Sequence, residues 1–419
     1  MPNNQQVIDK IAEKASFKWQ ESALLIGMLK DKYSHLVGGG TEQTNRIRRS
    51  MFSSASHDGQ DSSSSENLQD EGSVTLGVNF EKHQKVPVTE NEMKYSISDF
   101  QRQIIDPAIR QLSSEAELFA HTYVAQNAGG KVGIAGTAPT SVGILNDVAK
   151  RFDKYGVPTD KRLSILSPDM KYAILPDLQQ KEVSEVLPAA LRDGKIGNIS
   201  GISHYMHNIN YAHKTGNYGG TPLVNGTLQT TSWTLARDTY VSTVNTDGWT
   251  SGATLKKGDI ISIDGVNAVH PQTKADLGIK QHFTVIADAV AGAGGDMAII
   301  VTPPLIAVNN TGNSANYMTV ASAPADNAPI TVESGAADTT FGANSLAFHP
   351  EALAFRSDPL ARPPKNVGGQ VAFSTKNKGS LPITCMMYYD PLTKKTYAEF
   401  HMRFALAVVE PRAVIQILG

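Results

Sequence analysis

The sequence is poor in cysteine and has no long apolar run. Cys385 is the single cysteine among 419 residues. No intrachain disulfide can therefore form, and a reducing compartment fits best. The opening stretch MPNNQQVIDKIAEK has no hydrophobic signal core, and no apolar run approaches the ~20 residues that span a bilayer. We expect a protein made and used in a cytoplasm, without a membrane partner.

An excess of charge of either sign is also missing. The formal net charge is −2, so the chain as a whole is no electrostatic trap for nucleic acid. Apolar residues make up 40% and charged residues 19%, with 35 Gly and 21 Pro. That composition is typical of a soluble, strand-rich and loop-rich protein and excludes coiled-coil and disordered chains. The length allows two or three domains.

Motifs of common enzymes are absent. The sequence contains neither the phosphate-binding G-x-x-x-x-G-K-[ST] nor the G-x-S-x-G of many hydrolases. His349-Pro350-Glu351 has the H-x-E order of zinc deaminases, but those enzymes also need two cysteines that this chain lacks. We expect no catalytic residue and no cofactor, and hence no enzyme.

Three histidines lie close together in the stretch SHYMHNINYAH: His204, His207 and His213. Two histidines three residues apart on a helix can share a metal ion. This stretch alternates like a strand, however, on which positions three apart face opposite sides. No nearby acid or cysteine completes a ligand set, so we expect no metal site here.

Two stretches share a pattern of apolar strand, polar residue, proline and acid: LSILSPDMKYAIL (163–175) and SLAFHPEALAF (345–355). Proline suits the first helical position because its missing N–H would have no partner there. An acid beside it faces the positive end of the helix dipole. We expect both stretches to be strands followed by helices, with Ser167 and His349 at the caps.

The N-terminal region predicts a helix and then a long hairpin. Apolar residues at helical spacing over 5–36 predict an amphipathic helix, which three glycines at 38–40 end. Arg46, Arg48 and Arg49 then precede a Ser/Asp/Gly tract that is too polar to order itself. The strand-like SVTLGVNF follows, so we expect the tract to form the tip of a hairpin arm. A floppy surface loop is the alternative.

A long helix is predicted from Pro107. Proline favours the first helical position, and apolar residues follow on one stripe until Gly129-Gly130 ends the pattern. About 20 residues at ~1.5 Å each give a helix of roughly 30 Å. A mixed α/β region follows to about Tyr218, with a helix in TSVGILNDVAKRFDKYGVP and a strand in RLSIL.

The region from about Pro222 to Ala337 has a different character. Helical periodicity disappears, and short β-rich runs separated by turns predict a small barrel or sandwich. After it the α/β pattern returns. The chain ends with two predicted strands, LPITCMMYYD and TYAEFHMRFALAVVEPRAVIQIL. A β-domain is therefore expected to be inserted in an α/β host.

This order of elements resembles the major capsid protein of tailed bacteriophages, the Hong Kong 97-like fold, and most of all short-tailed phage coat proteins with an inserted β-barrel. LPAALRDGKIGNISGI resembles the helix–turn–strand of the family's axial domain, and LKKGDIISIDGV resembles a hairpin of its insertion domain. The resemblance covers nearly the whole chain and implies an α+β fold. The implied parts are an N-terminal helical arm (1–44), an extended loop (45–85), a peripheral domain with a spine helix (86–160), an axial domain in two parts (161–221 and 338–380), an inserted β-barrel domain (222–337) and C-terminal strands (381–419).

The resemblance also implies a function and partners. The chain would assemble with itself into pentamers and hexamers of an icosahedral virion shell, through a scaffold-directed procapsid in the host bacterial cytoplasm. The implied partners are a separate scaffolding protein, a portal protein and packaged double-stranded DNA, the last by weak contact only. No lysine occurs from Met51 to Glu81, which argues against the loop crosslink of some relatives, and the few residues before the loop leave no room for a fused scaffolding segment.

Contacts of the long loop between subunits are the candidate functional site. Arg46, Arg48 and Arg49 precede the polar tract, and Asp70 and Glu71 follow it. Exposed ion pairs contribute only ~0–1 kcal/mol each. Such pairs would therefore determine how two subunits align, and would add little to the affinity between them. A solvated charged loop is the alternative. For the whole chain, the alternatives are a tail or receptor-binding component of a virion, motivated by 222–337, and a hydrolase with a β accessory domain.

Overall fold

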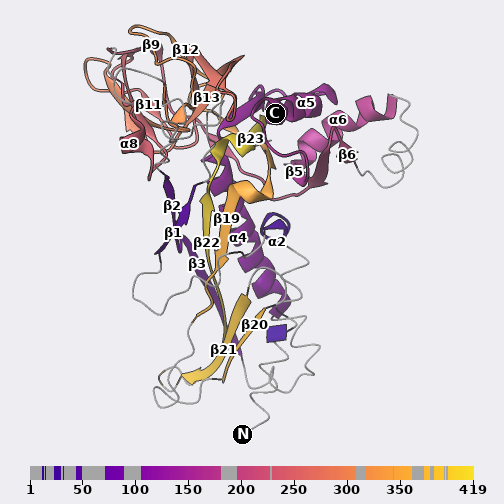
Figure 1. Ribbon diagram of the computed structural model, residues 1–419. Coiled ribbons are helices and arrows are strands. Elements are labelled where there is room, and N and C mark those ends of the chain that lie inside the picture. Colours follow the sequence, from indigo (N-terminus) through magenta and orange to yellow (C-terminus); the bar gives the residue numbers. More distant parts are fainter. Residues whose placement is uncertain are drawn as a thin grey trace, which may run out of the picture. The chain divides into compact units, whose positions relative to one another are not determined.

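The computed structural model describes residues 12–13, 15, 23–29, 32, 44–49, 71–88, 105–180, 196–226, 229–307, 317–342, 344–360, 372–377, 382–390, 392 and 395–419 (Figure 1). The chain divides into two compact units. The first comprises Met1–Asn45, Thr75–His121 and Leu353–Ala407, and the second Arg46–Val74, Thr122–Ala352 and Val408–Gly419. No helix among the described residues is long and apolar enough to cross a membrane.

A long antiparallel sheet forms the first unit. Its central strand β22 (Lys395–Val408) pairs with β3 (Phe80–Val88) in a ladder that runs from Phe404 opposite Phe80 to Thr396 opposite Val88. The order of the remaining strands is β19-β22-β21-β20, with β19 at Leu353–Ser357, β20 at Ala372–Asn377 and β21 at Pro382–Asp390. Side chains alternate along β22, which buries Ala398, Phe400, Met402 and Phe404 on one face.

Helix α4 (Asp106–Ala125) lies along that buried face (Figure 1). The ring of Phe119 lies 5.3 Å from the ring of Phe80 and 6.0 Å from that of Phe404, and Phe80 and Phe404 stack at 4.6 Å. Aromatic pairs at such separations add to the stability that area burial gives. The predicted long helix opening at Pro107 is confirmed, with Asp106 in its first turn.

A buried carboxylate on α4 holds the short helix α2 (Leu25–Met28). The Oε2 atom of Glu117 accepts a hydrogen bond from the Leu25 N–H at 3.0 Å, and Oε1 accepts one from the Ile26 N–H at 3.1 Å. No side chain of α2 itself caps its N-terminus, so Glu117 satisfies N–H groups that have no partner within the helix. Burial raises the pKa of Glu117 to about 7, against the lowering effect of these bonds.

The second unit contains a mixed sheet of six strands in the order β4-β23-β18-β5-β7-β6. The strands are β4 (Gly130–Gly133), β5 (Arg162–Leu166), β6 (Gly197–Ile199), β7 (Ile202–Met206), β18 (Ser345–Phe348) and β23 (Val414–Leu418). Helix α5 (Gly143–Lys154) precedes β5 in the chain, and α6 (Pro168–Gln180) connects β5 to its parallel neighbour β7. The predicted helix in TSVGILNDVAKRFDKYGVP and the predicted strand RLSIL are confirmed.

The two strand–proline stretches turn out differently. At Ser167 the prediction is confirmed, because its Oγ accepts a hydrogen bond from the Met170 N–H at 3.2 Å at the start of α6. At His349 the predicted helix is wrong. A single 3-10 turn, η5 (Pro350–Ala352), is followed directly by strand β19.

Burial explains the difference between the two stretches. Along α6 the buried residues Met170, Ile174 and Leu178 recur every four positions, as one face of a helix requires. All five residues of β19 are buried. The apolar stretch from Ala352 to Phe355 is buried without a break, which suits a strand covered on both faces better than a helix with one exposed side.

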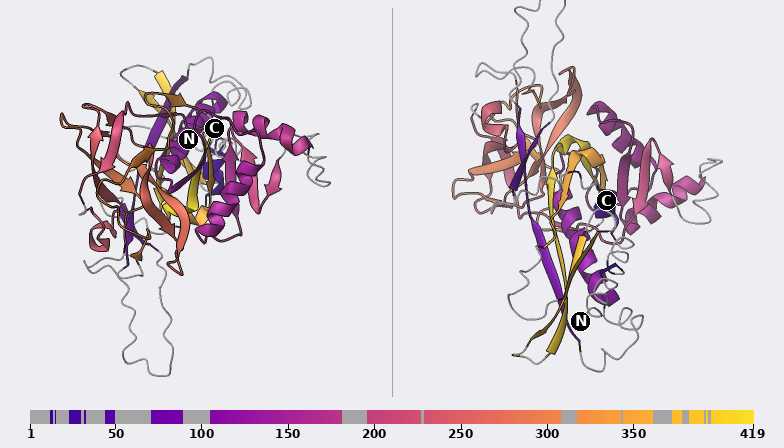
Figure 2. Two further views of the ribbon diagram at one scale, coloured as in Figure 1. Left: turned by 90° about the horizontal axis from the view of Figure 1, so that it is seen from above. Right: turned by 60° about the horizontal axis from the view of Figure 1, so that its bottom comes forward.

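The chain between the two parts of the mixed sheet is β-rich. Its main sheet has the order β16-β12-β13-β15-β10-β9, with β9 (Gly220–Val224), β10 (Ser242–Trp249), β12 (Ile260–Val269), β13 (Asp276–Val285), β15 (Met297–Thr302) and β16 (Ile330–Val332). A separate pair is β11 (Thr254–Leu255) with β14 (Ala289–Val290), and α8 (Trp233–Ala236) is a single helical turn. Figure 2 shows these strands, salmon to orange, gathered together apart from the purple and magenta helices α5 and α6.

This β-rich part has its own apolar core. Val244, Trp249, Ile263, Phe283 and Ile299 are among its buried residues. Its base is tied to the segment after α4: the Thr284 Oγ1 donates to the Ala128 carbonyl at 2.6 Å, and the Gln281 amide donates to the Gly129 carbonyl at 3.1 Å. The strands therefore have a core of their own and a polar connection to the mixed sheet.

The C-terminal region corrects a second prediction. The stretch expected to form one long strand contains two, because β22 ends at Val408 and β23 begins at Val414. Between them lies the 3-10 turn η6 (Pro411–Ala413), where the Glu410 side chain accepts a hydrogen bond from the Arg412 N–H. Proline has no N–H for a ladder, so β22 cannot continue through it. Most of the predicted 5–36 helix and residues 50–70 of the loop lie outside the described residues.

The pKa of Glu117 predicts a pH-dependent stability. Folding raises the pKa of Glu117 from 4.5 to about 7. The contribution of this side chain to the unfolding free energy is therefore fully present below pH 4.5 and is lost as the pH rises through 7. That difference corresponds to about 3 kcal/mol. In Glu117→Gln, the loss of unfolding free energy between pH 4.5 and 7 should be smaller than in the parent, as measured by urea unfolding along a pH series.

The matched control is Glu115→Gln on the same helix. The Glu115 carboxylate is partly exposed and bonded to Lys82 at 2.7 Å, which lowers its pKa. The bond between Glu115 and Lys82 stabilises the fold above pH 4.5 and weakens only as the pH falls below that value. The difference in unfolding free energy between Glu115→Gln and the parent should therefore be constant from pH 4.5 to 7. If the unfolding free energy fell equally with pH in the parent and in Glu117→Gln, the pH dependence would not come from Glu117.

Candidate functional site

The stem of the long loop is a two-stranded sheet of β1 (Thr44–Arg48) and β2 (Ser73–Gly77). Beyond β1, the Arg49 N–H donates to the Gly72 carbonyl at 2.9 Å and extends the pairing by one step. Residues that the sequence placed at the tip, including Asp70, lie outside the described residues. The described part of the loop is therefore its base.

Arg49 anchors the base of the loop in the interior of the second unit. Its guanidinium lies 3.6 Å from the centroid of the Tyr240 ring and donates a hydrogen bond to the Val409 carbonyl. The side chain is buried, unlike that of Arg48. Burial lowers the pKa of Arg49, against the effects of Tyr240 and Glu410. A buried cation–π contact of this kind is worth ~2 kcal/mol.

Glu410 and Arg412 complete a charged cluster around Arg49 and Tyr240. The Arg412 Nε donates to Glu410 Oε1 at 3.0 Å. Burial alone would raise the pKa of Glu410, but the charges of Arg412 and Arg49 bring it below its ordinary value. A buried arginine needs such an anion, because an unpaired charge is costly in the interior. Glu410 thus partly offsets the two guanidinium charges at the base of the loop within one subunit.

A second contact holds the stem to the turn around α8. The Ser73 hydroxyl donates to Asp238 Oδ1 at 2.7 Å, which lowers the pKa of that carboxyl with help from Arg237 and Arg46. Gly72 passes so close to this turn that a Cβ atom on it would lie 2.4 Å from the Arg237 carbonyl oxygen. Only glycine fits there.

The structure gives each predicted site residue a place. Arg48 and Glu71 form an ion pair at 3.3 Å across the stem, with side chains 85% and 43% exposed. Arg46 is exposed near Asp238, and Arg49 is buried. Opposite charges on the two sides of the loop therefore meet within the chain at Arg48 and Glu71. Pairing between subunits stays a prediction.

A buried carboxylate that the sequence did not reveal closes the base of the β-rich part. Asp259 Oδ1 accepts hydrogen bonds from His213 Nε2 at 2.7 Å and the Ser334 hydroxyl at 3.1 Å. Its Oδ2 accepts from the N–H groups of Gly216 at 3.1 Å and Lys256 at 2.7 Å. Asp259 is fully buried, and its four donors come from segments before, within and after the β-rich strands.

His204, His207 and His213 have separate surroundings, and the Nδ1 of His207 accepts a hydrogen bond from the Ile209 N–H at 3.2 Å. His204 lies on β7, where burial lowers its pKa to about 4. His213 lies on the short strand β8 (His213–Lys214) and contacts Asp259 and the Tyr211 hydroxyl, the latter at 2.7 Å. The acid that partners His213 comes from the stretch LKKGDI, 46 residues further along the chain, and proximity in sequence does not reveal it. The available signal is an aspartate that directly follows a glycine turn and precedes an apolar strand.

His349 also has a structural place. Its Nε2–H donates to the Asp160 carbonyl at 3.0 Å, and its Nδ1 accepts from the Glu351 N–H at 3.3 Å. Both ring nitrogens are therefore used in joining a strand end to η5. The H-x-E order is explained by this turn.

A family model decides the identity of the chain. The model of the P22 coat protein, gene protein 5, matches residues 4–419. The chain belongs to the P22 coat protein family. It is accordingly a major capsid protein of a tailed-phage virion, a structural protein and not an enzyme. The family match does not favour the tail-component and hydrolase alternatives.

Solved structures similar to this coat protein include several from phages. One from Mycobacterium phage Che8 has 11% identity over 94% of this chain and 90% of that chain, with a TM-score of 0.45. The mature capsid of bacteriophage PhiM1 has 9% identity over 90% and 82%, with a TM-score of 0.42. The CUS-3 coat protein I-domain has 30% identity over 28% of this chain and 97% of that chain, with a TM-score of 0.21. No curated protein matches the sequence.

Arg49 should matter far more than its neighbour Arg48. Arg49→Ala removes the cation–π contact and the hydrogen bond to the Val409 carbonyl, so we expect a loss of about 2 kcal/mol in unfolding free energy. Arg49→Lys should recover only part of it, because an ammonium lacks the planar stacking group. Urea unfolding of the purified subunit measures both.

The control for this pair is Arg48→Ala. Its ion pair with Glu71 is exposed, and such pairs contribute ~0–1 kcal/mol. Similar losses in Arg49→Ala and Arg48→Ala would show that the base of the loop is not anchored through Arg49.

Asp259→Asn should destabilise the subunit strongly. The amide would replace one acceptor oxygen with a donor, leaving buried N–H or hydroxyl groups without a partner at a cost of about 3 kcal/mol. Asp288→Asn is the matched control, because Asp288 also accepts from a backbone N–H (Lys257, 2.8 Å) but is 56% exposed. Its cost should stay below ~1 kcal/mol. Equal unfolding free energies for the two variants would contradict the role of Asp259.

Proposed function

We propose that this coat protein has a Hong Kong 97-like fold with an inserted β-barrel at 222–337, and that its extended loop, 45–85, lies on a neighbouring subunit. Pentamers and hexamers of the chain would then form an icosahedral shell through a scaffold-directed procapsid. The partners would be a separate scaffolding protein, a portal protein and double-stranded DNA held by weak contacts. The subunit would meet these partners in the host bacterial cytoplasm.

The anchored base of the loop carries this proposal. Arg49, Ser73 and Gly72 fix both ends of the loop on the subunit. The tract between them, with its run of Ser, Asp and Gly, has too little apolar surface to form a core. The loop is therefore fixed at its base, while its polar tract cannot form a core by itself. This combination suits a segment whose contacts are made with another subunit. Such a contact is heterologous, and repeated around an axis it closes a ring.

The β-rich part supports a stabilising role for the insertion. It has its own buried core, and Asp259 joins segments on both sides of it. Lys131 on β4 also pairs with Glu333 at 2.8 Å, beside the end of β16. An insertion tied in this way adds its folding free energy to the unit that carries it.

Charge and composition fit weak contact with DNA and non-covalent assembly. The net charge of −2 gives the chain as a whole little attraction for phosphates. No lysine occurs between Met51 and Glu81, so a covalent crosslink through a lysine of that segment cannot form. The shell would then be held together by the area buried between subunits and by the alignment of each loop on its neighbour.

Replacing residues 51–70 with a short Gly-Ser turn tests the loop. The base is anchored within the subunit, so the variant should fold with an unchanged circular dichroism spectrum. It should nevertheless fail to form shells when mixed with scaffolding protein, as judged by light scattering and negative-stain electron microscopy.

A variant with residues 51–70 in scrambled order serves as the control, because it keeps length and composition. If defined contacts with a neighbour matter, it should also fail to assemble; if the loop is only a solvated spacer, it should assemble normally. Normal shells from the shortened variant would overturn the proposed role of the loop.

A further inference from the structure

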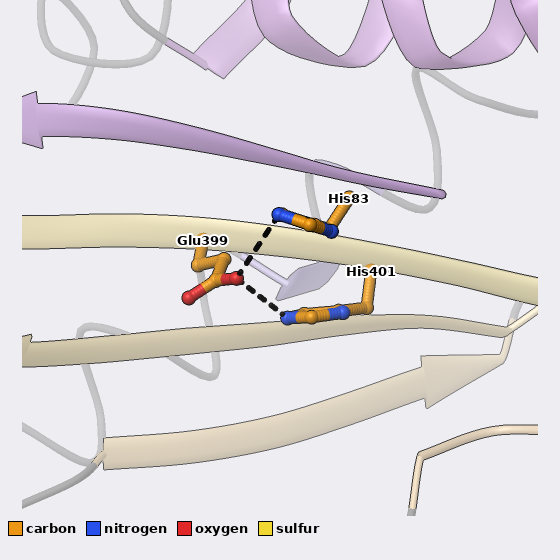
Figure 3. Close-up of side chains that lie close together, drawn as sticks. All are labelled: His83, Glu399 and His401. Atoms are coloured by element: carbon orange, nitrogen blue, oxygen red, sulfur yellow. Dashed lines mark ion pairs between the residues drawn. The ribbon is translucent and has the colours of Figure 1, made fainter. Parts of the chain in front are cut away.

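Two histidines and a glutamate meet on the face of the first unit's sheet that lies opposite α4 (Figure 3). His83 on β3 is directly opposite His401 on β22, and Glu399 precedes His401 by two residues. Positions two apart on a strand share a face, and opposite residues of paired strands do the same. The register therefore places all three side chains together.

The ligand atoms converge. Glu399 Oε1 lies 3.1 Å from His401 Nε2 and 3.9 Å from His83 Nε2, and all three atoms are within 4.8 Å of one another. The two imidazole rings stack at 5.3 Å with planes 24° apart, so both present the same edge to the carboxylate.

His401 Nε2 is shielded from solvent and lies 3.1 Å from the Glu399 carboxylate. The side chains of His401 and Glu399 are only 14% and 13% exposed, whereas that of His83 is 59% exposed. Two of the three candidate ligands are therefore largely buried.

The neighbouring cations are engaged elsewhere. Lys85 is opposite Glu399 in the ladder, but its ammonium lies over the ring of Tyr397 at 4.0 Å. Arg403 pairs with Asp358 at 3.1 Å and with Glu81 at 3.6 Å. The Glu399 carboxyl group therefore faces the two histidines, and neutral imidazole nitrogen and carboxylate oxygen are both ligands of divalent transition metals.

We propose that His83, Glu399 and His401 bind one divalent transition-metal ion, of which Zn²⁺ is the best fit. Zinc binds imidazole nitrogen at ~2.0–2.1 Å and carboxylate oxygen at ~2.0–2.2 Å, which sets tetrahedral ligand atoms about 3.3 Å apart. The separation of 3.1 Å already meets this requirement, and the one of 3.9 Å needs a small shift of the exposed His83 ring. Nitrogen-rich sets of this kind disfavour Mg²⁺ and Ca²⁺.

Three protein ligands leave a fourth position open on the side of His83. Water or a side chain of another molecule can fill it. The ion would join β3 to β22 across the sheet, so binding would stabilise the first unit without any change of fold. This role is independent of the one proposed for the loop.

Zinc titration of the full-length, metal-stripped coat protein tests the site. Competition with a chromophoric chelator should reveal one equivalent of Zn²⁺ whose affinity falls about tenfold or more in Glu399→Gln and in His83→Ala. Zn²⁺ should raise the Tm of the parent but not of these variants, and Mg²⁺ should have no effect. Co²⁺ bound to the parent should show the visible absorption of a tetrahedral site.

Glu81→Gln is the matched control, since it removes a carboxylate from the same face and strand but keeps the three ligands. It should bind Zn²⁺ like the parent. His83 is exposed, so its replacement tests the site even if changes at the more buried Glu399 prevent folding. Unchanged zinc affinity in both His83→Ala and Glu399→Gln, or no binding by the parent, would overturn the proposal.

Discussion

The buried carboxylate of Asp259 joins three stretches of chain that are distant in sequence. Its partners are His213 and Gly216 before the β-rich strands, Lys256 within them and Ser334 after them. A charge without water is tolerated only when its lone pairs are all occupied. These segments must therefore come together as a set, which closes the β-rich part at the point where the chain enters and leaves it.

The same physical solution recurs at other joints of the subunit. Glu117 holds the N-terminal end of α2 through two backbone N–H groups, and Arg49 is balanced by Glu410 and Tyr240 at the base of the loop. At each joint a buried polar side chain with fixed partners supplements apolar packing. Apolar contacts tolerate sliding, whereas a buried hydrogen-bonding group with fixed partners permits one arrangement. A subunit that must fit identical neighbours gains from this restriction.

Local patterns in the sequence predicted elements whose causes are local. Pro107 and the stripe after it marked α4, and Ser167 and Pro168 marked the start of α6, since caps and helical spacing depend on nearby residues. The same reasoning failed at Pro350. There, β19 is a strand because it pairs with β22, which lies far along the chain. Residues that meet through strand pairing, such as His83 with His401, left only the E-x-H spacing as a sign.

The position of β23 has a consequence for synthesis. This strand lies between β4 and β18 in the mixed sheet, yet residues 414–418 follow every other strand of that sheet in the chain. A ribosome makes the neighbours first, and their facing edges remain unpaired until β23 emerges. A chain that stops before residue 414 therefore lacks an inner strand of this sheet and exposes the edges of β4 and β18, which chaperones and proteases recognise.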